Sequence, residues 1–375
     1  MLNILIIVAH LIVNLVTGKP KEVAPANADF IKAAPGYEVP PFTNGSNVQD
    51  YLPAGYVRNG SVDYTEYIQL AINRNDKIIF PGFPLLVNDQ GLKIGSNKSI
   101  VFLKGSEIRL KSSDKIKYAI LDIKSVSNVS LYNPVIIGDR YSHRGDKGEW
   151  GMGISIKGAS NIKVFGAKVT NCWGDGIYLG QHGANKVNKN ILISKAFLSK
   201  NRRDGISIIS VDGLVLEDVY ASYQDGTKPM CGINFETNNP SCEIKNVKVI
   251  NPKTEFNRGS GIQISIGTML GGGDKEVDVK IINHIDVGSK SFAMKLSCNR
   301  KSGTLGGTVG GLVSIMNPSW NKTIGDRPLA FVTDERDLKM TVSSPKIQKS
   351  NGVALNANQM RVVMNKHSNG NLKIF

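Results

Sequence analysis

Gly153-Ile154-Ser155-Ile156 is the first of five copies of one short motif in this chain. The other copies are Gly176-Ile177-Tyr178-Leu179, Gly205-Ile206-Ser207-Ile208, Gly232-Ile233-Asn234-Phe235 and Gly261-Ile262-Gln263-Ile264. Their glycines are 23, 29, 27 and 29 residues apart. Each copy places apolar residues one and three positions after the glycine, with a polar or amphipathic residue between them, which is the alternation of a strand with one buried face. Repetition at this period is typical of solenoids and other repeat folds.

A second short run of alternating aliphatic residues follows each copy, and less regular runs precede the first. The runs lie at residues 161–164, 190–193, 213–216, 243–247 and 277–281, and earlier at 97–103, 107–110 and 128–131. Short strands separated by Gly, Asn and Asp turns, without an amphipathic helix between them, favour a coiled parallel sheet over a βαβ fold. A sandwich or a propeller would not repeat the same inward positions at a near-constant period. We predict an all-β fold, a single-stranded parallel β-helix (solenoid) of about ten coils.

Two motifs stand ahead of the repeats. Residues 62–72 read Val-Asp-Tyr-Thr-Glu-Tyr-Ile-Gln-Leu-Ala-Ile, and residues 78–82 read Ile-Ile-Phe-Pro-Gly. They resemble the Thr-x-x-Ile-Gln-x-Ala-Ile helix and the Phe-Pro strand with which right-handed β-helix domains of the pectin-lyase superfamily often begin. The resemblance covers roughly residues 60–300. It implies a right-handed β-helix whose short N-terminal helix caps the open end of the first coil, and an activity on polysaccharides as a hydrolase, lyase, epimerase or phage tailspike depolymerase, although a minority of members are non-catalytic.

The first 60 residues are expected to lie outside the solenoid. Residues 1–18 contain no charged side chain and residues 2–16 are almost wholly apolar, which is typical of a signal peptide; a short membrane anchor is the alternative. Residues 19–60 carry six prolines and are interpreted as an irregular lead-in. Residues 61–375 then form one β-helix domain with a terminal cap, in which 338–342 and 360–364 are strand-like. A signal peptide would make the protein secreted or periplasmic, without stable membrane association after its removal.

The charge balance narrows the class of partner. Lys and Arg number 46 against 31 Asp and Glu, a formal net charge of +15. An excess of this size favours an acidic glycan, a nucleic acid or an anionic membrane surface. The chain lacks a basic helix or an aromatic-interleaved basic motif of the kind that binds nucleic acid. We therefore expect an acidic polysaccharide as the partner and no nucleic acid.

Cysteine and histidine spacings do not indicate a metal site or a required cofactor. The four cysteines show no CxxC spacing and the five histidines are scattered. Cys231 and Cys242 could form a disulfide in an exported protein, or all four cysteines are buried thiols. Calcium (Ca²⁺) is a possible ligand of acidic side chains on neighbouring repeats, for which Asp175, Asp204 and either Asp225 or Glu236 qualify.

Residues that share an offset from the repeat glycine should form a column along the solenoid. Three positions before the glycine this column reads Trp150, Trp173, Arg202, Pro229 and Arg258, with Lys228 one position away. Aromatic faces stack on sugar rings and guanidinium groups pair with carboxylates, so the column is typical of a groove for an acidic glycan. Packing of both tryptophans in a turn is the alternative. Tyr178, within the second motif, and Glu236, directly after the fourth, are further candidate substrate-binding residues.

One position before the glycine the column reads Met152, Asp175, Asp204, Cys231 and Ser260. Two carboxylates at one register on adjacent coils should share a proton, which supplies a general acid beside a general base. A carboxyl separation near 5 Å would suit a retaining hydrolase and one of roughly 6.5 to 9.5 Å an inverting one. The alternative is Asp-Gly turn chemistry, in which each aspartate accepts local backbone amides and never meets a substrate.

A charged insertion at residues 139–149 interrupts the repeats and is expected to be a surface loop. Within it His143 and Glu149 could act as base or acid, and Tyr141 could protonate a leaving oxygen. Arg202, Arg203 and Lys228 could neutralise a uronate during β-elimination. His182, in Gly180-Gln181-His182-Gly183, is a weaker candidate. A solvated loop without a catalytic role is the alternative.

These patterns favour a secreted polysaccharide-active enzyme that cleaves glycosidic bonds in an acidic glycan, by hydrolysis or by β-elimination. The superfamily's polygalacturonase-like hydrolases carry Asn-Thr-Asp, Asp-Asp, Gly-His-Gly and Arg-Ile-Lys motifs, and only residues 181–183 approach one of them. We therefore do not carry that mechanism over. The alternative function is a non-catalytic β-helix that binds glycans or serves as an adhesin-type structural protein.

Overall fold

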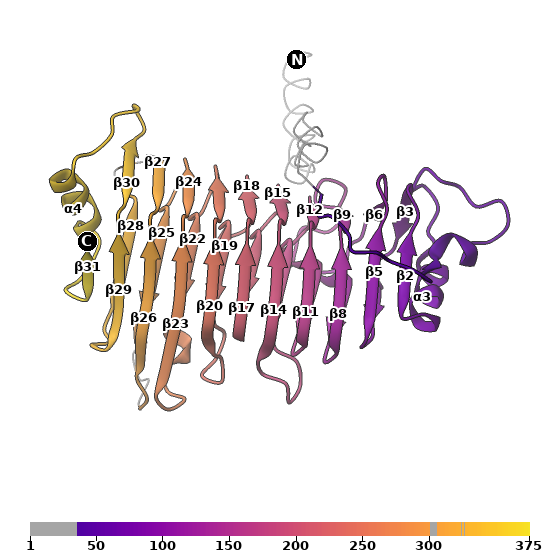
Figure 1. Cartoon of the computed structure of the whole chain (residues 1–375), viewed down its shortest axis with the longest axis horizontal. Helices are drawn as coiled ribbons and strands as arrows, with labels where there is room; N and C mark the ends of the chain where they lie inside the picture. Colours follow the sequence, from indigo (N-terminus) through magenta and orange to yellow (C-terminus); the bar gives the residue numbers. More distant parts are fainter. Residues whose placement is uncertain (1–35, 301–305, 324, 326) are drawn as a thin grey trace, which may run out of the picture.

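Strands from successive repeats pair in parallel and build three long sheets that wrap around one core. The structure, a computed structural model, describes residues 36–300, 306–323, 325 and 327–375. The coils stack along the long axis of the molecule (Figure 1), and most coils contribute one strand to each sheet. Pairing along every sheet is parallel, from residues 46–47 with 78–79 at one end to residues 340–342 with 372–374 at the other. The fold is thus a parallel β-solenoid of about ten coils, as predicted.

The strands of the described residues belong to three sheets, called A, B and C. Sheet A contains β1 (Ser46–Asn47), β2 (Lys77–Phe80), β5 (Lys98–Phe102), β8 (Ser127–Tyr132), β11 (Ser160–Phe165), β14 (Asn188–Ser194), β17 (Val211–Glu217), β20 (Ile244–Ile250), β23 (Lys275–Ile282), β26 (Val309–Met316), β29 (Leu338–Ser343) and β31 (Leu372–Ile374). Sheet B contains β3 (Pro84–Val87), β6 (Glu107–Leu110), β9 (Val135–Ile137), β12 (Lys168–Thr170), β15 (Phe197–Ser199), β18 (Tyr220–Ser222), β21 (Lys253–Glu255), β24 (Ile285–Val287), β27 (Ser319–Thr323) and β30 (Lys346–Lys349). Sheet C contains β4 (Leu92–Ile94), β7 (Lys117–Lys124), β10 (Trp150–Lys157), β13 (Ile177–Gly180), β16 (Ile206–Ile208), β19 (Ile233–Glu236), β22 (Ile262–Ser265), β25 (Met294–Cys298) and β28 (Leu329–Thr333).

The five glycine-isoleucine motifs lie directly beside one another in sheet C. The first isoleucines of the motifs are register partners from coil to coil, and their side chains are fully buried: Ile154, Ile177, Ile206, Ile233 and Ile262. The polar residue that follows each isoleucine faces outward. The stacking of residues that share an offset, on which the candidate site depends, is therefore confirmed.

Most strands of sheet B were not predicted from the repeat pattern; the exception is the run at residues 107–110, which forms β6 as expected. Six of the sheet's strands, from β9 to β24, have only three residues each. Such a run is too short to show an alternation of apolar and polar residues that differs from a turn. The strands expected after each motif are those of sheet A.

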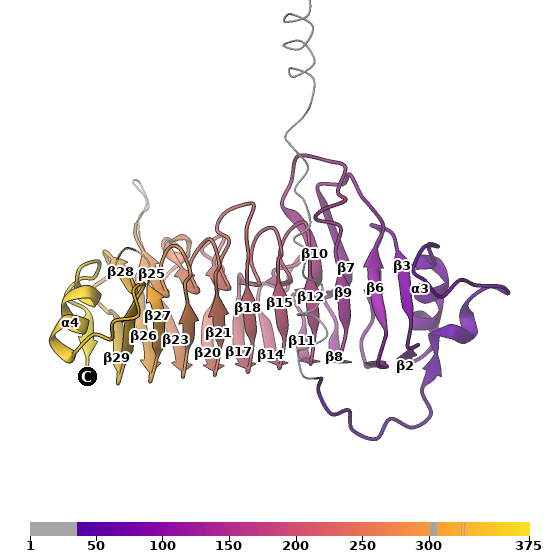
Figure 2. The same ribbon diagram turned by 90° about the horizontal axis from the view of Figure 1, so that it is seen from above.

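A helix covers each end of the solenoid (Figures 1 and 2). The predicted N-terminal cap is α3 (Thr65–Arg74), which buries Ile68, Ala71 and Ile72 against the first coils. The far end is covered by α4 (Ala357–Asn365), so the strand-like interpretation of residues 360–364 is wrong. Asn356 accepts a hydrogen bond from the backbone N–H of Gln359, whose side chain bonds back to Asn356, and this capping box starts a helix. Two short 3₁₀ helices, η1 (Val48–Tyr51) and η2 (Gly267–Met269), complete the helical elements of the described residues.

Part of the predicted lead-in belongs to the solenoid. Strand β1 pairs with β2, and Val48 is fully buried, so the packed structure begins before residue 61. Tyr37 donates its backbone N–H to Asn133 (2.7 Å) and stacks on Phe165 with ring centroids 4.3 Å apart. Residues 1–18, interpreted as a signal peptide, lie outside the described residues. In the described ranges, no helix combines the length and apolarity needed to cross a membrane.

Candidate functional site

The column one position before each repeat glycine ties neighbouring coils together. In four successive steps a side chain on one coil accepts the backbone N–H of the residue at the same offset on the next coil. Met152 Sδ accepts from the N–H of Asp175 (3.4 Å), and Asp175 Oδ1 accepts from the N–H of Asp204 (3.0 Å). Asp204 Oδ1 then accepts from the N–H of Cys231 (2.7 Å), and Cys231 Sγ accepts from the N–H of Ser260 (3.4 Å). The predicted register of Asp175 and Asp204 is confirmed. Each aspartate accepts a backbone N–H from the next coil, whereas the alternative interpretation expected it to accept local amides of its own turn.

Arg203 lies at the centre of four carboxylates. Its Nη1 donates to Asp175 Oδ2 (3.1 Å) and to Asp204 Oδ2 (3.2 Å), and its Nη2 donates to Glu236 Oε2. Its Nε lies 4.0 Å from Glu149 Oε2 and has no hydrogen-bond partner within the described residues. These five residues, called the Arg203 cluster below, come from four consecutive coils, so only stacking brings them together.

The polar residues of the repeat motif complete the hydrogen bonding of this cluster on the outer face of sheet C. Ser207 Oγ donates to Asp204 Oδ2 (3.0 Å) and accepts from Arg203 Nη1 (3.2 Å). Asn234 Nδ2 donates to Asp204 Oδ2 (3.0 Å) and to Glu236 Oε2 (3.3 Å). Sequence reasoning missed Ser207 and Asn234 as site residues, although their motif offset already predicted that they face outward beside the aspartates.

Burial and mutual repulsion keep the two aspartates of the cluster from ionising together. Burial raises the pKa of Asp175, which Arg203 partly opposes. Burial and the neighbouring charge of Asp175 raise the pKa of Asp204 to about 7. The pair therefore holds a proton close to neutral pH. Burial alone would lower the pKa of Arg203, but Asp175, Asp204 and Glu236 raise it, so the guanidinium stays charged.

Exposure separates the four carboxylates into two kinds. The side chains of Asp175 and Asp204 are fully buried, whereas those of Glu149 and Glu236 are 33% and 34% exposed. The expected projection of both aspartates into an open groove is wrong, because backbone amides and Arg203 occupy their oxygens. Glu149 and Glu236 are the carboxylates of the cluster that a solute can reach.

Tyr178 continues the outer row of sheet C next to the cluster. The residue is half-buried, and a Cβ at Gly180 would come within 2.1 Å of its ring, so the tyrosine ring lies directly over Gly180 and a larger residue there would displace it. Burial and the charge of Asp175 raise the pKa of Tyr178 to about 12. Its hydroxyl therefore stays a neutral donor at physiological pH.

The aromatic part of the predicted glycan column is packed rather than open. Trp173 is only 8% exposed, because the His143 ring stacks on it at 4.0 Å and the Arg202 guanidinium lies 3.8 Å from its ring centroid. Trp173 is thus the packing residue that the alternative interpretation described, and it offers no open face to a sugar. Trp150, at the start of β10, is 45% exposed and remains a candidate for stacking on a sugar.

The charged insertion is partly buried, contrary to the surface-loop expectation. Asp139 accepts from the backbone N–H of Ser113 (2.9 Å), from the Tyr118 hydroxyl and from His143 Nδ1 (2.8 Å), and burial of these polar groups depends on that network. The His143 side chain is fully enclosed, so it cannot contact a substrate as the predicted acid or base. Arg140 is also buried and donates to the backbone carbonyls of residues 200 and 201.

The other predicted binding residues lie away from the Arg203 cluster or at its margin. Tyr141 packs against the Arg140 guanidinium at 5.1 Å. Lys228 is exposed. His182 is exposed, contacts Ser125 Oγ through Nδ1 (2.9 Å), and follows β13 at the end opposite Asp175.

The described residues contain no recognisable metal-binding site. No group of three or more His, Cys, Asp or Glu side chains in the described part of the chain is arranged to hold a metal ion. In the Arg203 cluster a guanidinium occupies the centre of the carboxylates, so a calcium ion would have to displace it. Calcium dependence stays a prediction. The four cysteines are free and buried, which is the alternative to the Cys231–Cys242 disulfide.

Comparison with known proteins agrees with this architecture. A family model described as the right-handed β-helix region matches residues 152–269, the segment that carries the motif and the Arg203 cluster. The chain folds as a right-handed parallel β-helix. This fold is in line with the resemblance of residues 60–300 to the pectin-lyase superfamily.

Two curated relatives come from Bacillus subtilis strain 168. The SPbeta prophage-derived uncharacterized protein YorA is 26% identical over 162 residues, which are 39% of this chain and 28% of that protein. The uncharacterized protein YclG is 25% identical over 213 residues, 48% of this chain and 36% of that protein. The chain therefore matches about a third of the length of these relatives.

Solved structures share the fold at low sequence identity. A tailspike protein of the Escherichia coli bacteriophage HK620, in complex with a pentasaccharide, is 14% identical with a TM-score of 0.64, and the match covers 88% of this chain and 59% of that one. The A-module of the mannuronan C-5 epimerase AlgE4 of Azotobacter vinelandii is 14% identical with a TM-score of 0.55, covering 82% and 89%. PfbA, a surface adhesin of Streptococcus pneumoniae, is 10% identical with a TM-score of 0.52, covering 81% and 88%.

Proposed function

We propose that the protein is a polysaccharide-active enzyme that hydrolyses glycosidic bonds at the Arg203 cluster, with Glu149 and Glu236 as its acid and base. The observation that carries this proposal is the pair of one-third-exposed carboxylates that converge on one buried guanidinium. Two carboxyl groups that face one substrate are the machinery of glycoside hydrolysis. Similarity in fold to a tailspike that holds a pentasaccharide and to a mannuronan epimerase supports a glycan as the substrate.

The charge of the cluster favours hydrolysis over β-elimination. One cation faces four carboxylates, and the cluster keeps a negative surplus even when Asp175 and Asp204 share a proton. Hydrolysis passes through a cationic, oxocarbenium-like transition state, which a negative surplus stabilises. Elimination from a uronate builds negative charge and needs an uncompensated cation. Arg203 cannot supply one, because its carboxylates already neutralise it.

The two glutamates differ in how firmly they are held. Glu236 accepts hydrogen bonds from Arg203 and Asn234, which fixes it as a base or nucleophile. Glu149 lies 4.0 Å from Arg203 Nε, directly before β10, and its looser attachment suits the proton donor that must reach a leaving oxygen. Exposed Trp150 and neutral Tyr178 flank the pair and would contact the sugar rings.

Glu149→Gln and Glu236→Gln test this proposal. Each change keeps the shape of the side chain and removes its ionisation, so release of new reducing ends should fall by about 100-fold or more. Glu66→Gln on the exposed face of α3 is the matched control and should keep wild-type activity. Products that absorb in the ultraviolet as unsaturated uronides would instead identify an eliminase. Wild-type hydrolysis by both variants would refute the assignment of the acid and base.

A non-catalytic glycan-binding or adhesin-type protein is the second candidate. Complete burial of Asp175, Asp204 and His143 favours it, because three of the four predicted catalytic side chains cannot touch a ligand. Similarity in fold to the adhesin PfbA also supports it. A protein of this kind would retain a glycan without releasing any product, and neither glutamine substitution would alter that.

A further inference from the structure

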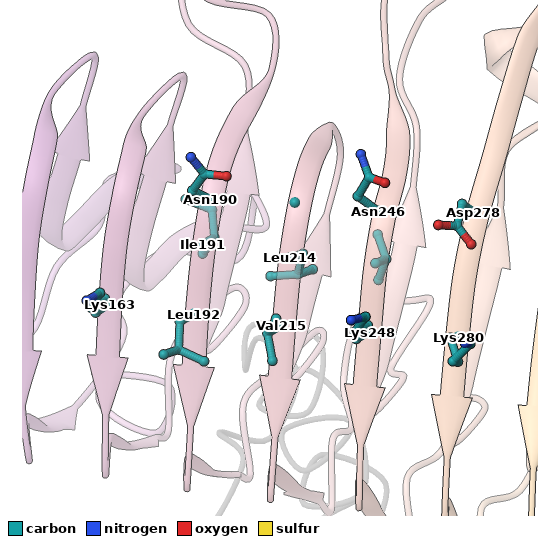
Figure 3. A pocket seen from close by; sticks show the side chains of 12 residues that line it. Lys163, Asn190, Ile191, Leu192, Leu214, Val215, Asn246, Lys248, Asp278 and Lys280 are labelled. Carbon is teal, nitrogen blue, oxygen red and sulfur yellow. The ribbon is translucent and has the colours of Figure 1, made fainter.

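The outer face of sheet A carries a groove that the Arg203 cluster does not use. It has a volume of about 480 Å³ and is lined by residues of β11, β14, β17, β20 and β23. One row of register partners crosses these five strands, and Figure 3 shows its members side by side: Lys163, Leu192, Val215, Lys248 and Lys280. Two aliphatic side chains therefore form a floor with lysines on both sides.

The groove exists because one member of an asparagine ladder is missing. Asn161 Nδ2 donates to Asn128 Oδ1 (3.2 Å), and Asn190 Nδ2 donates to Asn161 Oδ1 (3.1 Å). The next coil has Gly213 at this bulge position, and Asn246 follows one coil later. All these positions have positive φ, from 53° to 60° at the asparagines and 81° at Gly213, a region that Asn tolerates. The missing side chain at Gly213 leaves the notch between Asn190 and Asn246.

The lysines of the groove lack the carboxylate partners that lysines elsewhere on the solenoid have. Lys245 and Lys275 share Glu243 at 2.8 and 2.7 Å. Lys163, Lys248 and Lys280 are exposed, and none of them forms an ion pair with another of the described residues. Lys248 and Lys280 are moreover direct register partners on adjacent strands, where like charges repel. An arriving anion would relieve this repulsion.

The lining also selects the class of anion. Its side chains are aliphatic, amide, lysine and one aspartate, Asp278, without an aromatic ring or an arginine on which a nucleobase could stack. All five strands are paired on both sides, so a peptide cannot join the sheet by strand addition. Aliphatic side chains can contact the apolar face of a sugar ring, and the amides of Asn190 and Asn246 can bond its hydroxyls.

We propose that this groove is a non-catalytic binding site for an anionic polysaccharide, a polyuronate chain that lies across the strands along the solenoid axis. Its carboxylates would face Lys163 at one end and Lys248 with Lys280 at the other, and a sugar ring would rest on Leu192 and Val215. The net charge of +15 assists the encounter. The site belongs to sheet A, whereas the Arg203 cluster lies on sheet C, so the proposal does not depend on hydrolysis.

Calorimetric titration of the full chain with an alginate oligosaccharide tests the charge of the site. The triple substitution Lys163→Gln, Lys248→Gln and Lys280→Gln should weaken binding by about tenfold or more. The matched control replaces Lys104, Lys339 and Lys366, which are exposed and lie outside the groove, and removes the same net charge. Its affinity should stay within about twofold of the wild type. Equal losses of alginate affinity in both triple variants would show that only the net charge of the protein matters, and this would overturn the proposal.

Gly213→Asn tests the shape of the groove without changing its charge. A Cβ at Gly213 would lie 3.1 Å from Asn190 Oδ1, so the new side chain would occupy the notch as another member of the ladder. Alginate affinity should fall by about tenfold while the melting temperature stays close to that of the wild type. Unchanged affinity in this variant and in the lysine variant would refute the site. If the substitution unfolds the chain, the lysine variants decide alone.

Two further ligands identify the occupant. Dextran, which is neutral, should bind at least about tenfold more weakly than alginate. If duplex DNA bound more tightly than alginate, with the same dependence on the three lysines, the occupant of the groove would be a nucleic acid and the polyuronate proposal would be wrong. Glu149→Gln and Glu236→Gln should leave alginate affinity at the groove unchanged, so a failure of the hydrolytic proposal and a failure of this one are distinguishable.

Discussion

The Arg203 cluster on sheet C and the groove on sheet A are built by the same device and have opposite character. In both, side chains at one offset from successive coils form a row. The cluster gathers four carboxylates around one buried cation, whereas the groove gathers three exposed lysines around an aliphatic floor. A solenoid repeats its backbone but not its outward residues, so each face can carry its own charge. The difference shows that overall net charge does not describe either surface.

The largest expected effect tests whether the cluster depends on its cation. Arg203→Met should lower the free energy of unfolding by about 3–5 kcal/mol, because it leaves buried carboxylates without a counter-charge. Lys163→Met on sheet A should change it by no more than about 0.5 kcal/mol. Urea denaturation of both variants measures the contrast. Similar stability losses would mean that the two faces do not differ in burial as described.

The next largest effect is on the pH dependence of the unfolding free energy, to which the cluster on sheet C should contribute and the groove on sheet A should not. The folded pKa of Asp204, about 7, lies above its unfolded value, so the folded state binds the extra proton and stability falls as pH rises from about 4 towards 7. Asp204→Asn removes the group that takes up this proton. The slope of the unfolding free energy against pH should therefore become shallower by up to about 1.4 kcal/mol per pH unit. Asp278→Asn in the groove of sheet A is the control and should keep the wild-type slope. A slope that survives Asp204→Asn would disprove the shared proton.

Salt concentration should change ligand binding on sheet A much more than cleavage on sheet C. Alginate binding at the exposed lysines should fall by about tenfold between dilute buffer and 1 M salt, where the Debye length shrinks to about 3 Å. Cleavage of the glycan at the Arg203 cluster should change much less, because the main ion pairs of the cluster are buried. Calorimetry and a reducing-end assay over one salt series measure both. Parallel salt curves would argue that a single surface serves both ligands.

The smallest expected effect concerns the two facing lysines. Lys248→Gln should raise the free energy of unfolding by about 0.2–1 kcal/mol, because it removes a like-charge pair with Lys280. Lys163→Gln should give no such gain, since its register partners are Ser130 and Leu192. Thermal melts without a glycan detect this difference. Equal shifts in the two variants would show that the lysine repulsion is already screened.

Several features followed from sequence reasoning: two depend on the repeat period, and the capping helix was implied by the family resemblance. The stacking of the isoleucines, the common register of Asp175 and Asp204, and the capping helix at residues 65–74 were all predicted correctly. The helix α4 was missed, although Asn356 and Gln359 form a capping box that could have identified it. Apart from β6, the strands of sheet B were missed, because most of them have only three residues and so carry no periodic signal.

The direction of individual side chains was not predictable in the same way. Offset determines which residues are neighbours, but turn torsions and the neighbouring insertion decide whether each points to solvent. Trp173 shares its offset with Trp150 and is nevertheless buried, because His143 and Arg202 close over it. Asp204 is buried because the amide of Cys231 and the guanidinium of Arg203 take its oxygens.

Sequence alone therefore determined the solenoid and its columns, since a repeated pattern of inward aliphatic residues can bury its apolar face only by stacking on copies of itself. Tertiary structure decided which members of each column remain accessible. It selected Glu149 and Glu236 as the reachable carboxylates and left a notch at Gly213, because accessibility depends on what residues from other coils place in the same space.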